Sequence, residues 1–437
     1  MIEALLLLAL TGMMQAARSF GAGADTGGTE LAFGYLLLAA YFSAKIVSRL
    51  GLPRLTGYLI AGVVAGPYVL GHVDFHMTDS LRVVNGAATC VLGLTAGGEL
   101  NIKRVRPLLR TLRSITFYGV LFAMVALTVL MFVLRPFLPM FSGMPTLESF
   151  MVCALIAVAL SAQSPAVVMA LLAETRAEGP LSRLVLATVV VADLVVIIVY
   201  SIVAAITGAV LGGELDLAST SLEIVWELFG SMAFGVLIGV LIGGFIRSVK
   251  GGGASLFALL VCVVVAEIGS RVALDPLVVM LTAGVWLRNF SKSNADELLH
   301  GFESAELPVF LVFFSLAGSK LDLGQLWATL IPVVLVAAAR AAVFFFGCKK
   351  ACAMTNADPA ITRYGWTGLV PQAGLSLALV VVIQRNFPTF GPSASILLLS
   401  VVGVNQLIAP VLLRLSLVNS GEAGKRAATG FAQQHGS

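Results

Sequence analysis

Long apolar runs separated by short polar stretches make up most of the chain. A helix that crosses a membrane needs about 20 largely apolar residues, and this criterion predicts fourteen spans. They cover roughly residues 2–17, 30–50, 54–71, 80–98, 114–135, 147–172, 181–209, 222–247, 253–270, 275–290, 304–320, 325–349, 361–386 and 392–416. The pattern predicts an all-α polytopic membrane protein.

Composition supports this prediction. With 59% hydrophobic and 11% charged residues, the chain of 437 residues has too little polar surface to cover a soluble particle. The five cysteines lie in or beside apolar runs, and their spacing suggests neither a metal site nor a disulfide framework. We therefore expect the lipid bilayer as the surrounding medium, no resident cofactor and no nucleic-acid partner.

The basic residues indicate the orientation. Most of the 27 lysines and arginines fall in one set of alternate loops. The opposite set contains only Arg18, Arg82, Arg135, Arg271, Lys320 and Arg385. Because cytoplasmic loops carry the excess of basic residues, we expect both termini in the cytoplasm and the protein in the cell's inner (plasma) membrane.

Two short motifs occur twice, in the same order and at nearly the same separation. Leu-Ile-Ala-Gly-Val at 59–63 resembles Leu-Thr-Ala-Gly-Val at 281–285, and Ala-Gly-Gly-Glu-Leu-Asn-Ile at 96–102 resembles Ala-Gly-Ser-Lys-Leu-Asp-Leu at 317–323. Each copy then spans seven helices, and an odd number inverts the second copy relative to the first. The sequence predicts two inverted seven-helix repeats.

The sixth and thirteenth spans, which the repeat makes equivalent, are both interrupted. The first break is Ser-Ala-Gln-Ser-Pro at 161–165 and the second is Leu-Val-Pro-Gln-Ala-Gly at 369–374. Short unwound segments in matching positions are the best sequence indication of a binding site at mid-membrane. The candidate residues are Ser161, Gln163, Ser164, Pro165, Pro371, Gln372 and Gly374. The alternative is that the prolines only kink their helices and the glycines only allow close packing.

Few charged residues lie deep within the spans. Asp193 is the deepest carboxylate, and Arg340 lies near the middle of the twelfth span. Charges at such depth face the bundle interior and mark functional sites by default, although a lone aspartate can also serve as a hydrogen-bonding residue between helices. Arg340 needs an internal partner, either an acidic side chain or the carbonyls of a broken helix. Glu267 and Glu99 lie toward span ends, which favours structural roles.

A single carboxylate between two broken helices suits ion exchange. The half-helix ends carry partial charges and the unwound segments offer oxygen ligands, so Asp193 could hold a small cation. Burial favours the neutral acid whereas a bound cation favours the carboxylate, so proton and cation compete for one group. This competition is sufficient for cation/proton exchange and needs no covalent chemistry, which predicts a transporter and not an enzyme.

Several stretches together resemble the monovalent cation/proton antiporter superfamily, which has the sodium/proton exchanger fold. They are residues 53–67 (PRLTGYLIAGVVAGP), 93–100 (GLTAGGEL), Ser164-Pro165, Ala192-Asp193, Ala266-Glu267 and the run from Asp275-Pro-Leu277 to Gly284. The resemblance covers about residues 30–416, preceded by an extra helix and linker (1–29) and followed by a short tail (417–437).

The resemblance implies interleaved core and dimerisation domains, two crossed broken helices, a homodimer and elevator-like movement of the core. Asp193 matches the family's ion-binding aspartate, whereas Arg340 matches a basic residue at the crossover, where Glu267 is a further electrostatic candidate. The chain departs from the best-known patterns at Ala192, Gln163 and Gln372-Ala-Gly374.

A lone carboxylate without a second aspartate at position 192 favours one-for-one, electroneutral exchange. Na⁺ is the first choice of substrate and K⁺ the second. Two alternatives use the same fold: a sodium-coupled symporter of an organic anion, and a sensor that has lost transport.

Overall fold

A computed structural model describes residues 2–20, 28–212, 226–248, 254–291, 308–321, 323–324 and 329–425. Parts of the predicted regions 1–29 and 417–437, together with Asp322 of the second repeated motif, lie outside these residues. All the described elements are helical, as the apolar pattern predicts.

The helices follow one another in this order: α1 (Ile2–Phe20), α2 (Gly28–Arg49), α3 (Arg54–Ala65), α4 (Phe75–Ser80), α5 (Arg82–Glu99), α6 (Ile102–Val105), α7 (Leu109–Ile115), α8 (Phe122–Leu134), α9 (Thr146–Leu160), α10 (Pro165–Thr175), α11 (Pro180–Val210), α13 (Ser231–Ser248), α14 (Ala254–Val272), α15 (Pro276–Asn289), α18 (Leu330–Thr355), α19 (Pro359–Tyr364), α20 (Gly374–Asn386) and α21 (Gly391–Asn419). Short 3₁₀ or π turns are η1 (Arg106–Leu108), η2 (Thr116–Leu121), η3 (Arg135–Phe137), η4 (Pro139–Phe141), η5 (Trp226–Gly230) and η6 (Gly365–Leu369). A further apolar helix covers Pro308–Ser319.

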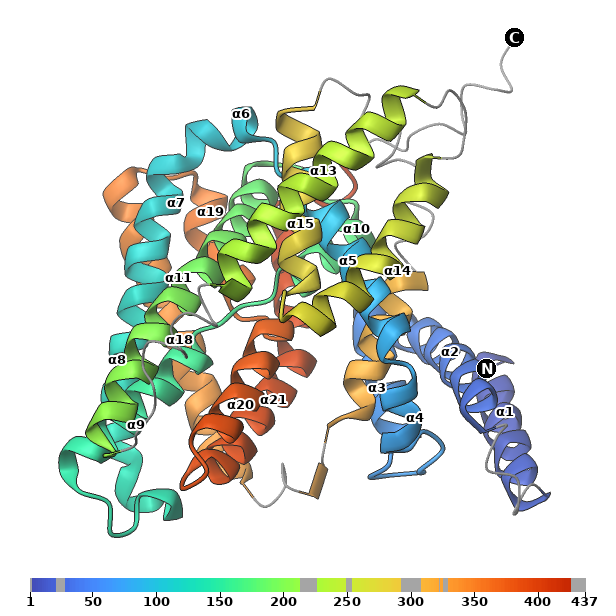
Figure 1. The fold of residues 1–437 in the computed structure, drawn as a ribbon, viewed down its shortest axis with the longest axis horizontal. Coiled ribbons are helices and arrows are strands. Elements are labelled where there is room, and N and C mark those ends of the chain that lie inside the picture. Colours follow the sequence, from blue (N-terminus) through green and yellow to red (C-terminus); the bar gives the residue numbers. More distant parts are fainter. Residues whose placement is uncertain are drawn as a thin grey trace.

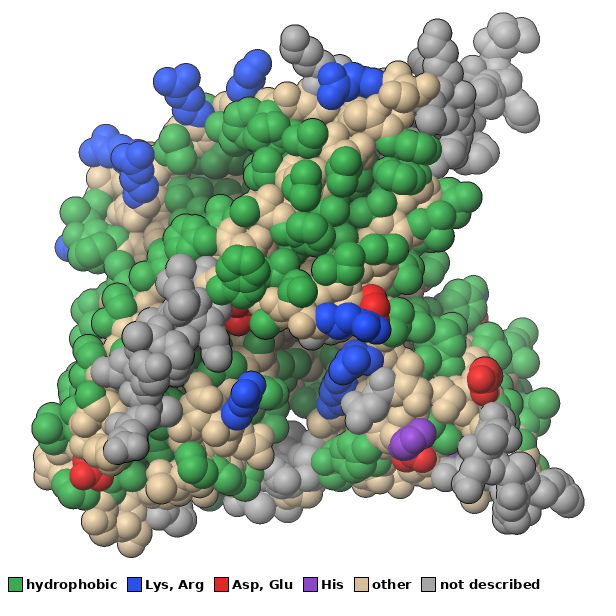
Figure 2. Space-filling view, viewed as in Figure 1, with side chains coloured by type: hydrophobic (Ala, Val, Ile, Leu, Met, Phe, Trp, Pro, Cys, Tyr) green, Lys and Arg blue, Asp and Glu red, His purple; other side chains and the backbone are tan. Residues whose placement is uncertain are grey.

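By length and hydropathy, 8 of the described helices can cross a membrane. Shorter apolar helices cover Ile2–Ala17, Arg54–Ala65, Ser255–Gly269 and Pro308–Ser319. The polytopic class is therefore confirmed, whereas the count of fourteen spans is not. Hydrophobic side chains cover most of the face in Figure 2, as a surface surrounded by lipid requires.

The helices form two groups that lie side by side (Figure 1). In one group α2 packs against α1 and α3, α5 packs against α14 and α15, and α13 packs against α15. In the other, α18 packs against α7, α8, α21 and η6, and α9 packs against α8 and α11. The same group includes α10, which packs against α11 and α21, and α20, which packs against α21. We call these the α5 group and the α18 group. They meet where α10 contacts α3 and α5 and where α21 contacts α3.

The repeated motifs make equivalent contacts in the two halves. Gly62 of the first motif packs on the backbone of Ser315 in helix Pro308–Ser319, where an added Cβ would overlap the carbonyl oxygen. Gly284 of its second copy packs in the same way on the backbone of Leu94 in α5. Each helix with the Ala-Gly-Val motif thus packs on the Ala-Gly helix of the other half. The sequence repeat therefore has a structural counterpart within the α5 group.

Three helices begin with the same local device, a capping side chain followed by proline. Ser164 precedes α10, Asp275 precedes α15 and Asp358 precedes α19. Each side chain accepts a backbone N–H from the first turn of its helix. Proline fits the next position because that N–H has no partner within the helix. These pairs fix where the three helices start, and two of them border the candidate site.

Candidate functional site

The predicted interruptions are real gaps in the helices of the α18 group. Residues 161–164 are not helical and separate α9 from α10. Residues 370–373 separate η6 from α20. Gln163 and Gln372, one in each gap, are both fully buried. Backbone groups freed at such depth need partners from within the protein.

Arg340 supplies those partners to both gaps. Its guanidinium group is fully buried and donates four hydrogen bonds to backbone carbonyls. Two go to the first gap, from Nε to Leu160 O (2.5 Å) and from Nη2 to Ala162 O (2.9 Å). Two go to the second, from Nη1 to Val370 O (2.6 Å) and from Nη2 to Leu369 O (3.2 Å). Of the two kinds of partner expected for Arg340, the broken-helix carbonyls are the ones it contacts.

Gln372 adds a second bridge between the gaps. Its Nε2 donates to Leu160 O at 3.1 Å, so this carbonyl accepts from both Gln372 and Arg340. Its Oε1 accepts from Asn405 Nδ2 of α21 at 2.6 Å. A glutamine can donate and accept at once, which the charged guanidinium cannot. The two broken helices and α21 are thus joined by side chains.

Asp193 lies in α11 and faces a cavity of about 400 Å³ between the two helix groups. The first gap contributes Gln163, Ser164 and Pro165 to its wall, and the start of α20 contributes Gly374. Of the predicted site residues, the structure brings these five together. Figure 2 shows that this face of the molecule is hollowed near its middle, below α13 to α15.

Two oxygen atoms beside this cavity lack hydrogen-bond partners among the described residues. They are Oδ1 of Asp193 and Oε1 of Gln163, both shielded from solvent. The amide nitrogen of Gln163 is already engaged, because it donates to Ser161 O. Leaving a buried acceptor unpaired costs about 1–3 kcal/mol, and more for a charged group. A cation or a proton donor in the cavity would remove this cost.

The helix ends beside Arg340 and those beside Asp193 carry partial charges of opposite sign. The C-terminal ends of α9 and η6, where partial charge is negative, face Arg340. The N-terminal ends of α10 and α20, where it is positive, border the cavity that Asp193 lines. The basic and acidic side chains therefore each lie at helix ends of opposite sign. The sequence predicted the two gaps but not this division.

The cavity contains charged groups that the sequence analysis did not assign to it. Glu227 from η5 and Asp275 before α15 line it with Asp193, and so does Lys320. Asp193 is therefore not the only carboxylate in the cavity, which corrects the expectation of a lone acid. Asp275 belonged to the stretches that carried the family resemblance, but no role at the site was predicted for it.

Two of the predicted residues point elsewhere. Ser161 is buried, and its hydroxyl donates to Ala157 O in α9 (2.8 Å). Glu267 lies in α14 of the α5 group and pairs with Arg271, Oε1 to Nη2, at 2.7 Å. The structure does not bring Glu267 to the crossover. Pro371 is buried in the second gap beside Gln372.

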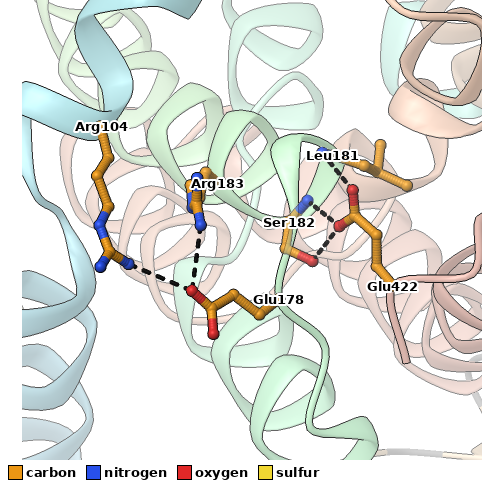
Figure 3. Close-up of polar contacts among 6 residues, drawn as sticks. All are labelled: Arg104, Glu178, Leu181, Ser182, Arg183 and Glu422. Atoms are coloured by element: carbon orange, nitrogen blue, oxygen red, sulfur yellow. Dashed lines mark hydrogen bonds and ion pairs between the residues drawn. The ribbon is translucent and has the colours of Figure 1, made fainter. Parts of the chain in front are cut away.

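The start of α11 is held by Glu422, a residue that lies about 240 positions later in the sequence. Glu422, which follows α21, is 5% exposed. Its carboxylate accepts the backbone N–H groups of Leu181 and Ser182, each at 2.8 Å, and the Ser182 hydroxyl at 2.6 Å (Figure 3). A negative group at a helix N-terminus satisfies free donors and complements the helix dipole. The helix that carries Asp193 is therefore anchored at its first turn.

A second carboxylate ties the same turn to α6. Glu178 Oε1 pairs with Arg183 at 3.1 Å and with Arg104 of α6 at 3.2 Å (Figure 3). These side chains are partly exposed, so the pairs contribute little to stability. They join the start of α11 to α6, which lies between α5 and α7 in the chain and so connects the two helix groups.

Comparison with known proteins agrees with this architecture. A family model described as "Sodium/hydrogen exchanger, transmembrane" matches residues 35–417. Among solved structures, the chain is similar to the sodium proton antiporter MjNhaP1 from Methanocaldococcus jannaschii, with a TM-score of 0.64 and 15% sequence identity. The match covers 90% of this chain and 97% of that chain. At this identity the likeness establishes the fold, and it confirms the predicted antiporter fold class.

Proposed function

Because the chain belongs to the sodium/hydrogen exchanger family, we propose that it exchanges a monovalent cation for protons at a site formed by Asp193 and Gln163. One observation supports the proposal above the others: Asp193 Oδ1 and Gln163 Oε1 lack partners, and both residues line the same cavity. A monovalent cation is bound by such oxygen atoms. A proton on Asp193 removes the charge, so the two ligands exclude one another.

The division into two helix groups suggests how Asp193 could move during transport while Asp275 stays in place. Asp193 and both gaps belong to the α18 group, whereas Asp275 lies between α14 and α15 of the α5 group. If the α18 group moves as a unit past the α5 group, Asp193 travels and Asp275 remains. Arg340 travels too, with the same charge in both directions. The proposal is therefore elevator-type movement with one proton exchanged for one cation, Na⁺ before K⁺.

The orientation and assembly expected from the sequence belong to the same proposal. Lysine and arginine side chains gather along one edge of the molecule, over α6 and α7 (Figure 2). We take that edge as cytoplasmic, in the plasma membrane, with a homodimer as the working unit. Lys320, which the charge pattern assigns to the external set of loops, lines the cavity, so we propose that Asp193 is reached from the outer side.

The alternative of an organic-anion symporter is disfavoured by charge. A cavity of about 400 Å³ is large enough for a small organic molecule. Its wall, however, contains Asp193, Glu227 and Asp275 against the single amine of Lys320. An anion would meet more negative than positive groups there. The cavity suits a cation.

Replacing Asp193 by asparagine tests the proposal. In proteoliposomes with a pH-sensitive dye inside, Asp193→Asn should abolish proton movement driven by Na⁺, Li⁺ or K⁺, because the amide cannot exchange a proton. Asp358→Asn is the matched control, since Asp358 is a cap in a polar loop and asparagine also caps helices. It should transport at the wild-type rate. Exchange by Asp193→Asn at that rate would refute the proposal.

Gln163 provides a separate test of the ligand set. Gln163→Leu removes Oε1 while keeping the approximate size of the side chain. The apparent KM for the cation should rise about tenfold, the effect of losing one polar contact to a charge, with a smaller change in maximal rate. An unchanged KM would exclude Gln163 as a ligand.

A further inference from the structure

A small side cavity adjoins the one that contains Asp193. Its volume is about 40 Å³, and its wall shares Glu227 and Asp275 with the larger cavity. Tyr200 is the third polar residue of this wall, and the remaining lining residues are aliphatic. A water molecule needs roughly 10–15 Å³ by this measure, so about three spheres of that size fit.

The hydroxyl group of Tyr200 is the least explained feature of this cavity. The side chain is only 1% exposed, yet the hydroxyl oxygen has no hydrogen-bond partner among the described residues. Buried tyrosine hydroxyls usually find a partner, and leaving one unpaired costs about 1–3 kcal/mol. Tyr200 itself lines a cavity large enough for a ligand. It therefore indicates an occupant with which it can form a polar contact.

The backbones of the two acidic residues are joined through a shared serine. The backbone N–H of Asp275 donates to Ser231 Oγ at 2.9 Å, and this hydroxyl donates to the backbone carbonyl of Glu227. Ser231 thus brings two residues from different elements to one cavity. The helix cap formed by Asp275 uses Oδ1, which accepts N–H groups of Leu277 and Val278. Oδ2 is not part of that cap.

The basic side chains near these acids do not line the side cavity. Lys320 lines the larger cavity only, and it is exposed. Arg271 of α14 pairs with Glu267. Two carboxylates that face one cavity repel each other unless a proton or a cation lies between them. The wall of the side cavity is therefore suited to a positively charged ligand.

We propose that Tyr200, Glu227 and Asp275 form a second, weaker binding site for a monovalent cation, on the predicted outer path to Asp193. Tyr200 follows Asp193 by seven residues in α11, which places it about 10 Å farther along the helix on the same face. The second site rests on the proposed function, because it supplies cations to the first. Ca²⁺ is disfavoured, since it needs six to eight oxygen ligands.

Equilibrium binding of radioactive Na⁺ to purified protein tests the second site, with Asp193→Asn as the background that removes the first. This variant should still bind Na⁺. Adding Glu227→Gln should weaken that binding about tenfold or more, and adding Tyr200→Phe should weaken it less, because only a neutral contact is lost. Glu148→Gln is the matched control, since Glu148 lies in the first turn of α9 and lines neither cavity.

The outcomes separate the two proposals. If Asp193→Asn loses both exchange and Na⁺ binding, the second site is refuted and the proposed function stands. If Asp193→Asn keeps exchange, the proposed function fails, and the second site is still decided by whether Glu227→Gln weakens binding and Glu148→Gln does not. Equal binding by these two variants would overturn it. Displacement of Na⁺ by much lower concentrations of Ca²⁺ would overturn it as a monovalent site.

Discussion

Replacing Arg340 by alanine should lower the free energy of unfolding substantially, because one side chain serves both helix gaps. The substitution removes the hydrogen bonds to Ala162, Leu369 and Val370, whereas Leu160 keeps its bond from Gln372. An unpaired buried acceptor costs about 1–3 kcal/mol, so three of them cost roughly 3–6 kcal/mol if some water enters the space.

Thermal unfolding in detergent micelles, followed by tryptophan fluorescence, measures this effect. A loss of that size should lower the Tm of Arg340→Ala by about 5 °C or more. The Tm of Arg340→Lys should fall between those of the wild type and Arg340→Ala. An ammonium group lacks the planar fork with which the guanidinium group reaches carbonyls in both gaps. Arg363→Ala is the control, since Arg363 is exposed and contacts the ring of Tyr364. Its Tm should match the wild type.

The same preparations should be assayed for cation-driven proton transport. We expect Arg340→Ala to lose stability while the residual activity keeps the wild-type order of preference among Na⁺, Li⁺ and K⁺. An unchanged Tm together with lost or altered exchange would refute the reasoning. Arg340 would then act on the ion and not on the architecture of the gaps.

Three other predictions follow from the contacts described. Gly62→Ala should destabilise the protein because its Cβ overlaps the backbone of Ser315, whereas Gly34→Ala, with open space around it, should not; Tm values decide this. Glu422→Ala should lower the stability by about 1–3 kcal/mol, because two N–H groups of α11 lose their acceptor; an unchanged Tm would contradict it. If Asp193 is the only carboxylate that moves, transport in proteoliposomes should proceed equally at zero and at a large membrane potential. A clear voltage dependence would show that a second charge moves.

Local patterns in the sequence were sufficient to locate the two gaps. Proline, glycine and small polar residues interrupt otherwise continuous apolar runs at 161–165 and 369–374, and residues 161–164 and 370–373 within them are non-helical in the structure. The depth of Arg340 also required an internal partner. Sequence could not choose between an acid and carbonyls, because that depends on how α18 crosses the gaps.

The other acids of the cavity could not be predicted in the same way. Asp275 and Glu227 lie at the starts of helices, where a carboxylate commonly caps or meets water. Their approach to Asp193 depends on how the α5 group packs beside the α18 group. Glu267, which the family resemblance offered as an electrostatic candidate at the crossover, lies on α14, and this helix packs within the α5 group.

Arg340 and Glu422 also constrain the order in which the protein can be completed during synthesis. Arg340 follows Leu160 by 180 residues, and Glu422 follows Ser182 by 240 residues. At about 5–20 residues per second, the ribosome needs roughly 10–50 s to make such lengths. During that time the carbonyls of the first gap and the start of α11 lack the partners that the finished protein gives them. A nascent chain that stops before Arg340 should therefore be recognised as incomplete by membrane quality control, even though its first helices are already inserted.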